Sequence, residues 1–316
     1  MKKKYAWITW ERQPRNYAMA NLIGAKYYEF NYKKPKFQRY LLCIKNTIEV
    51  FKGDYDVIFV QNPSIVLCFF SIFLKRIYKK KLVIDAHNAG VYPAEGRYRL
   101  LQSLNKYILR HADITIVTNQ HLLDSISKWG IKGIVITDPL PDYAESFFDT
   151  QVVPKKVMVI CSWAEDEPID IYLDTAKKMT SYDFYFTGNN KKYEFKTSIP
   201  KNVKLMGFVD ESEYLNCLFS SSVILDLTTR DDCLVCGAYE SISAEKPVVL
   251  TDNSTNRTVF QDAADYSELS VSELIATIYR AESIKTTDIH DFKVAYVEKN
   301  KLQRENLIQN LHAADN

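Results

Sequence analysis

The segment DDCLVCGAYE (residues 231–240) contains two sets of side chains that could carry chemistry. One is an acidic pair, Asp232 and Glu240, eight positions apart, and the other is a CxxC motif, Cys233 and Cys236. A zinc site would need a second pair of ligands at a suitable spacing, and the sequence has no second CxxC and no closely spaced histidine pair. We therefore expect no bound metal, and we expect these cysteines to pack within a helix or loop.

The acidic pair has a spacing that suits a helix. If a helix begins near Leu234, Asp232 lies at its N-cap and Glu240 follows about two turns later on the same edge. A carboxylate at position 240 could accept hydrogen bonds from two ribose hydroxyls, while Asp232 meets the hydroxyls of a sugar. Spacing alone leaves open an ordinary N-cap followed by a solvated glutamate.

Short β-branched and aromatic runs alternate with longer stretches of helical periodicity, which is typical of a parallel sheet covered by helices. The predicted strands are 5–10, 26–31, 56–60, 81–85, 113–118, 133–137, 157–161, 182–187, 203–206, 222–226 and 247–251. The predicted helices are 16–24, 36–52, 63–79, 97–111, 119–129, 168–179, 211–220, 234–245 and 270–283, with a tail helix at 292–311. The pattern predicts an α/β protein with two doubly wound domains.

A proline-rich, acidic stretch at 138–156 interrupts this alternation, and its three prolines are typical of a linker. The length of 316 residues also suits two domains of ordinary size. We predict an N-terminal domain over 1–150 and a C-terminal domain over 151–285. A helical tail over 286–316 would pack across both.

Ligands of doubly wound sheets bind at the carboxyl ends of the strands, so the residues that follow each strand are the candidates. His87 follows the predicted strand 81–85, and its imidazole could donate to a sugar hydroxyl or stabilise a leaving group, although it could equally cap its own loop. Arg230 follows strand 222–226, whereas Thr255 and Arg257 follow strand 247–251.

The segment DDCLVCGAYESISAEKPVVLTD (231–252) resembles the Glu-x7-Glu segment of family 4 type glycosyltransferases with the GT-B fold. Residues 56–88, CSWAEDEP (161–168) and ITDPLP (136–141) are similar to the eukaryotic β-mannosyltransferase that extends dolichol-linked chitobiose, and to related bacterial polysaccharide enzymes. This resemblance implies two Rossmann-like domains that face a cleft. It implies that Asp232 contacts the donor sugar and Glu240 the ribose, and a histidine of the family matches His87.

The chain departs from the family in the loop after the first strand of the C-terminal domain. The family commonly has an arginine and a lysine there, but this chain has SWAEDEP, so we expect Arg257 or Arg230 to meet the diphosphate. The GFV turn with Phe208 and Val209 is expected near the base.

The first strand is followed by WERQPRNYA, which has no G-x-G-x-x-G motif for a dinucleotide. The resemblance places this turn on the acceptor side, with Arg12 and Arg15 close to the acceptor or its diphosphate. An inverting transfer needs a carboxylate base near the acceptor hydroxyl, and Glu11 and Glu95 are the two candidates.

Charge divides unevenly along the chain, with +10 over residues 1–150 and −8 over residues 151–316. The apolar run at 64–74 is too short to span a bilayer, and the run after Lys4 is too short for a signal peptide. Helix 63–79 with its basic end, and the cations of 31–39, could bind an anionic leaflet, although a core helix with a solvated end fits equally well. We expect a cytoplasmic protein that is peripheral on the inner face of the membrane.

These observations together predict a glycosyltransferase of bacterial capsule, O-antigen or exopolysaccharide biosynthesis. It would move a sugar from a UDP- or GDP-linked donor to a polyprenyl-diphosphate-linked saccharide without a cofactor or metal. A nucleotide-sugar epimerase and a catalytically degenerate partner subunit are the alternatives. No nucleic-acid motif is present, and we expect no such partner.

Overall fold

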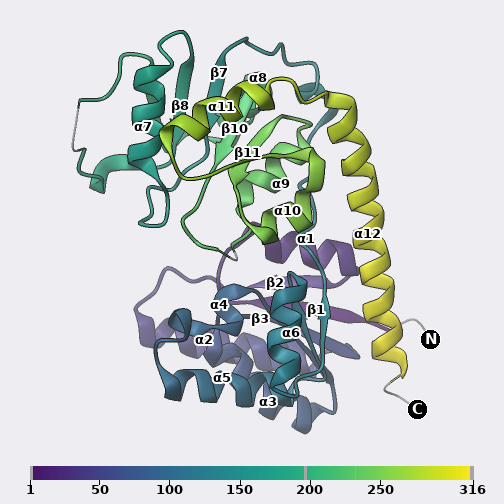
Figure 1. The fold of residues 1–316 in the computed structure, drawn as a ribbon. Coiled ribbons are helices and arrows are strands. Elements are labelled where there is room, and N and C mark those ends of the chain that lie inside the picture. The colour runs from purple at the N-terminus through teal and green to yellow at the C-terminus, as the bar shows by residue number, and fades with distance from the viewer. Residues whose placement is uncertain (1–2, 196–197, 232, 314–316) are drawn as a thin grey trace. The chain divides into compact units, whose positions relative to one another are not determined.

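The structure is a computed structural model that describes residues 3–195, 198–231 and 233–313 (Figure 1). The chain divides into two compact units. Unit 1 comprises Met1–Pro139 with Glu298–Asn316, and unit 2 comprises Leu140–Val297. The last helix, α12 (Thr286–Ala313), therefore contributes its first part to unit 2 and its last part to unit 1.

Unit 1 is built on a six-stranded parallel sheet with the order β2-β1-β3-β4-β5-β6. Its strands are β1 (Tyr5–Thr9), β2 (Lys26–Glu29), β3 (Val57–Asn62), β4 (Lys81–Ala86), β5 (Ile114–Val117) and β6 (Gly133–Val135). Its other helices are α1 (Pro14–Ile23), α2 (Lys36–Lys52), α3 (Ile65–Tyr78), α4 (Asn88–Val91), η1 (Pro93–Gly96), α5 (Arg99–His111) and α6 (Gln120–Lys128).

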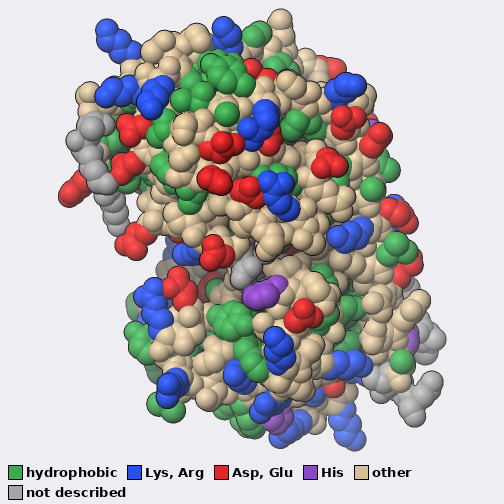
Figure 2. All heavy atoms as spheres, in the orientation of Figure 1, with side chains coloured by type: hydrophobic (Ala, Val, Ile, Leu, Met, Phe, Trp, Pro, Cys, Tyr) green, Lys and Arg blue, Asp and Glu red, His purple; other side chains and the backbone are tan. Residues whose placement is uncertain are grey.

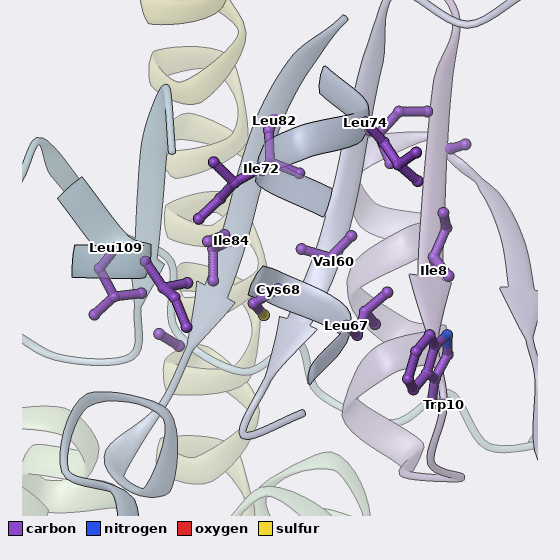
Figure 3. Packing of buried hydrophobic residues seen from close by; sticks show 14 of the residues in the cluster. Ile8, Trp10, Val60, Leu67, Cys68, Ile72, Leu74, Leu82, Ile84 and Leu109 are labelled. Atoms are coloured by element: carbon purple, nitrogen blue, oxygen red, sulfur yellow. The ribbon is translucent and has the colours of Figure 1, made fainter. Parts of the chain in front are cut away.

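Both faces of the unit 1 sheet are covered, because alternate residues of each strand point to opposite sides. On one face, Ile58 and Val60 of β3 pack against α2, α3, α5 and α6 (Figure 3). On the other face, Val57 and Phe59 pack against α1 and the end of α12, where Leu307 is fully buried. A strand that is buried on both faces reads as a continuous apolar run, which is why β3 and β4 could be recognised in the sequence.

Unit 2 has a second six-stranded parallel sheet, with the order β12-β11-β10-β7-β8-β9. Its strands are β7 (Lys156–Val159), β8 (Asp183–Thr187), β9 (Val203–Gly207), β10 (Val223–Asp226), β11 (Val248–Thr251) and β12 (Asp265–Ser267). Its helices are η2 (Glu145–Phe147), α7 (Ile169–Lys178), η3 (Asn190–Lys192), α8 (Glu211–Ser220), α9 (Cys236–Ser243), α10 (Ser254–Phe260), η4 (Gln261–Ala263) and α11 (Val271–Ala281). Helices α7 and α11 pack on one face, and α8, α9, α10 and the start of α12 pack on the other.

The predicted α/β class with two doubly wound parallel sheets is confirmed, and the differences are local. Helix α9 begins at Cys236 rather than near Leu234, and its N-cap is Val235. Strand β12 and helix α10 were not predicted, because each is short and its residues are largely polar. The tail helix is longer than predicted and begins at Thr286. Among the helices that the structure describes, none combines the length and the apolar character that crossing a membrane requires.

Candidate functional site

In unit 2 the order of the strands reverses between β7 and β10, which are neighbours in the sheet. The connections that follow two such strands run in opposite directions along the sheet. The crevice that this leaves at the carboxyl ends of the two strands is the usual place for a ligand. The loops that follow β7 and β10 are joined to each other here. The amide of Thr229 donates to the backbone oxygen of Asp166 at 2.7 Å, and the Thr228 hydroxyl donates to its carboxylate at 3.0 Å.

Glu240 lies in the second turn of α9, the helix that follows the β10 loop. Its carboxylate is partly buried and accepts a hydrogen bond from the hydroxyl of Tyr214 on α8. Burial raises the pKa of Glu240, and the hydrogen bond from Tyr214 lowers it in part. The side chain is therefore a positioned acceptor, and the fixed Tyr214 hydroxyl engages one of its two oxygens.

Asp226, the last residue of β10, connects the strand to this helix. Its carboxylate is buried and accepts a 2.8 Å hydrogen bond from the amide of Gly237 in the first turn of α9. A Cβ on Gly237 would lie 2.4 Å from the Asp226 Oδ2 atom, so only glycine allows this approach. Burial raises the pKa of Asp226 well above its ordinary value, and the charges of Glu240 and Glu167 raise it further.

The loop after β7 contains the carboxylate of Glu167, whereas the family that the sequence resembles commonly has an arginine and a lysine in this loop. Both Glu167 oxygens accept from the amide of Ser162, at 2.9 and 3.0 Å. One oxygen also accepts from the amides of Trp163 at 2.7 Å and Ala164 at 3.1 Å. Consecutive backbone N–H groups of this kind form a concave site for an anion, and here the chain fills it itself.

The cationic candidates of unit 2 lie at the surface. Arg230 has 57% of its side chain exposed and approaches Asp166 at 3.3 Å. Arg257 is 56% exposed, donates to both oxygens of Asp252 at 2.6 and 2.8 Å, and stacks over the ring of Tyr266. Both side chains are more than half exposed, so a phosphate can reach either guanidinium.

The remaining donor-side predictions fall on separate elements. Phe208 follows β9 with 92% of its surface exposed, beside the half-buried Val209. Thr255 is buried in α10. Asp232 lies outside the described residues, so its predicted contact with a donor sugar stays a prediction. Cys233 is half-buried and Cys236 exposed, and no cluster of potential metal ligands occurs in the described part of the chain.

In unit 1, His87 follows β4 and occupies the N-cap position of α4, but its side chain makes no capping hydrogen bond. The loop is held by two buried amides that the sequence did not single out. Asn62 at the end of β3 and Asn105 of α5 both donate to the backbone oxygen of Gly90 at 2.8 Å. Burial lowers the pKa of His87, so the imidazole is neutral at pH 7 and one of its nitrogens can donate.

Arg15 was expected near an acceptor, and the structure places it in a buried ion pair. Its guanidinium donates to both oxygens of Asp85 at 2.7 and 3.1 Å, and also to Asp138. Only 9% of the Arg15 side chain is exposed, and Asp85 is fully buried at the end of β4. The pair thus joins the start of α1 to the strand that precedes His87.

The other unit 1 candidates are exposed. Glu11 and Arg12 lie at the surface in the turn between β1 and α1. Glu95 lies in η1 with a left-handed φ of 55° and forms a 2.5 Å ion pair with Arg97. The exposure of both glutamates leaves them accessible to solutes.

Sequence reasoning missed Asp226, Tyr214 and Glu167. A signal was available for two of them. Asp226 ends a predicted strand eleven residues before Gly237, and Glu167 lies in the unusual SWAEDEP loop. Tyr214 had no such signal, because nothing in the sequence of α8 indicates that its hydroxyl meets Glu240.

No family model matches the sequence, and no curated protein is significantly similar to it. Solved structures do match. Sucrose-phosphate synthase from Thermosynechococcus elongatus is 12% identical, with a TM-score of 0.73 over 99% of this chain and 100% of that chain. HepE from Anabaena, in complex with UDP and glucose, is 11% identical, with a TM-score of 0.74 over 99% of this chain and 100% of that chain. UDP-GlcNAc 2-epimerase from Methanocaldococcus jannaschii is 12% identical, with a TM-score of 0.57 over 90% and 94% of the two chains.

These likenesses agree with the two six-stranded parallel sheets. The chain has the GT-B fold, as the resemblance in its sequence implies. At such low identity, activity has to be argued from the site itself.

Proposed function

We propose that the protein is a nucleotide-sugar-dependent glycosyltransferase. The observation that carries this proposal is the partly buried Glu240 carboxylate, which Tyr214 orients beside the strand-order reversal of unit 2. A ribose offers two adjacent hydroxyl donors, and a carboxylate is the side chain that can accept from both. The complex of HepE with UDP and glucose supports a UDP-linked donor.

The other roles follow the same scheme. Asp232 and His87 would bind hydroxyls of the donor sugar, and the neutral His87 ring would donate to one of them. Phe208, with its exposed ring, would stack on the base beside Val209, and Thr255 would line the donor loop. Arg257 and Arg230 would neutralise the diphosphate after exchanging their carboxylate partners for phosphate oxygens.

The acceptor in this proposal is a polyprenyl-diphosphate-linked saccharide of bacterial surface polysaccharide biosynthesis, bound at the cytoplasmic face of the membrane. The positive charge of residues 1–150 supports an anionic acceptor. Arg12 and the bases Glu11 or Glu95 are the accessible side chains of unit 1 that could meet it.

A thermal-shift series with UDP- and GDP-sugars tests the donor, because a ligand that binds only the folded protein raises its melting temperature. We expect one of them to raise it for the wild type and for Glu213→Gln, a control on the exposed side of α8. Glu240→Gln should abolish that shift, since an amide cannot accept two hydroxyl protons in the same way. A shift that persists in Glu240→Gln would contradict the ribose role.

An epimerase is the second candidate, because a UDP-GlcNAc 2-epimerase shares the fold. The two activities differ in their products. A transferase leaves the free nucleotide and a glycosylated acceptor, whereas an epimerase converts one nucleotide sugar into another without an acceptor. Formation of an epimerised nucleotide sugar in the absence of acceptor would replace the transferase proposal.

A further inference from the structure

Three neighbouring helices of unit 1 expose an unusual amount of apolar surface. Helices α2, α3 and α5 cover the same face of the sheet, with α3 in contact with both others. They carry nine of the twenty large apolar side chains that are exposed among the described residues. We call the outer sides of these three helices the α2–α3–α5 face.

Helix α3 shows the pattern most clearly. Its inner side buries Leu67 and Ile72 against the sheet (Figure 3), and its outer side carries an apolar stripe at helical spacing. The stripe consists of Val66, Phe69, Phe73 and Ile77, which are 45, 37, 46 and 67% exposed. Because the residues of the inner side already provide the apolar contacts with the sheet, folding does not require the outer stripe to be apolar. An apolar stripe on the outer side, in addition to the apolar inner side, indicates a second apolar environment for this helix.

The same face is strongly basic. Helices α2, α3 and α5 contain nine lysines and arginines and a single acidic residue, Glu49. Exposed cations lie next to the apolar side chains, as Arg76 does beside Ile77 and Arg99 beside Leu100. Figure 2 shows lysine and arginine side chains along the lower part of the view, over α2, α5 and α3 in the orientation of Figure 1.

The combination of positive charge and apolar surface indicates which kind of partner can bind the α2–α3–α5 face. A second copy bound through the same face would bring two sets of cations together, which like-charge repulsion opposes. A lipid leaflet with anionic headgroups offers apolar depth for aromatic and aliphatic side chains and phosphates for the cations. We propose that the α2–α3–α5 face docks the protein onto an anionic membrane surface.

The docking face gives the proposed glycosyltransferase a second partner, an anionic membrane surface. The link to a lipid-linked acceptor rests on that function, because such an acceptor lies in the leaflet that the face would bind. Vesicle binding itself is a property of unit 1 and needs no nucleotide sugar. The two proposals can therefore fail separately.

Co-sedimentation of the full chain with vesicles tests the docking face. We compare phosphatidylcholine vesicles with vesicles that contain about one-third phosphatidylglycerol, and expect at least about tenfold stronger binding to the latter. Binding should weaken between about 0.1 M and about 0.5 M salt, because salt screens the headgroup charge. Heparin is included as a soluble polyanion without apolar depth.

Two variants separate the apolar from the charged contribution. Phe73→Ser/Ile77→Ser should weaken vesicle binding by about tenfold or more, because both side chains lose their insertion into the leaflet. Lys45→Gln/Arg76→Gln should weaken it less and reduce its salt dependence. Val294→Ser/Leu302→Ser on α12, at 56 and 58% exposure, is the matched control and should bind as the wild type does.

Three results would overturn the docking face. The first is equal binding to neutral and anionic vesicles. The second is wild-type binding by both face variants. The third is that heparin abolishes vesicle binding while Phe73→Ser/Ile77→Ser leaves it unchanged. The melting temperature of each variant shows that it is folded. A donor-induced thermal shift without vesicle binding would overturn the docking face alone, and vesicle binding without any donor shift would count against the transferase alone.

Discussion

The buried ion pair of Arg15 and Asp85 gives the sharpest test of the structure. Replacing Arg15 by methionine keeps the bulk of the side chain but leaves the fully buried Asp85 carboxylate without its bidentate partner. Removal of one partner from such a pair costs about 3–5 kcal/mol, because the remaining charge is desolvated and uncompensated. Asp138 also loses a contact, but it is 26% exposed and can turn to water.

The double variant Arg15→Met/Asp85→Leu should recover most of that loss, because apolar replacement of both partners leaves no buried charge. Arg12→Met, an exposed neighbour, serves as the control and should stay within about 0.5 kcal/mol of the wild type.

Urea unfolding followed by tryptophan fluorescence measures these changes, since three of the four tryptophans, Trp7, Trp10 and Trp129, lie in unit 1. In a thermal scan with the same fluorescence readout, the melting temperature of Arg15→Met should fall by on the order of 10 °C. An unchanged transition in Arg15→Met, or a double variant no more stable than the single one, would refute the buried pair. It would also leave Arg15 open to the acceptor-side role that the family resemblance implies.

Three further predictions concern unit 2. Gly237→Ala should destabilise the protein by about 1–3 kcal/mol, because its Cβ would meet Asp226 at 2.4 Å and Ile160 at 2.8 Å; normal thermal unfolding would contradict this packing. Glu240→Gln should melt at a higher temperature than the wild type at pH 8. The folded-state pKa of Glu240 is raised, so the wild type loses free energy of unfolding as the pH rises and the buried carboxyl ionises, whereas glutamine stays neutral. The gain should shrink as the pH falls below that pKa, and calorimetry from pH 4 to 8 checks the sign. Phe208→Ala should leave the melting temperature unchanged but weaken donor binding by about 1–3 kcal/mol, measured by calorimetric titration, if its 92% exposed ring stacks on a base.

Much of the fold could be predicted from the sequence, because parallel strands that are buried on both faces leave a continuous apolar signature. Strands β3, β4, β5 and β10 were found within one or two residues of their bounds. Strand β12 was not, since its three residues, Asp265–Ser267, lie at the end of the sheet order and include two polar side chains. A strand of that kind is recognised only from its pairing with β11.

The candidate site was less accessible to sequence reasoning. The position of Glu240 after a buried strand and at helical spacing marked it as a candidate, and the structure gives it a partner in Tyr214. The same reasoning grouped Arg15 with Arg12, because both are cations in one turn, yet one is buried and the other exposed. Neighbouring residues of a turn point in different directions, and only the packed structure distinguishes them.

The sequence by itself determined the alternation of strands and helices, the basic character of the first half and the acidic segment at 231–240, because these depend on residue type and local spacing. Tertiary structure alone decided that Tyr214 of α8 meets Glu240 of α9, that Arg15 of α1 pairs with Asp85 of β4, and that α3 packs against both α2 and α5. Each of these depends on which segments the sheet order makes neighbours. Such contacts between distant parts of the chain leave no periodic trace in the sequence, so they become visible only when the strands are paired.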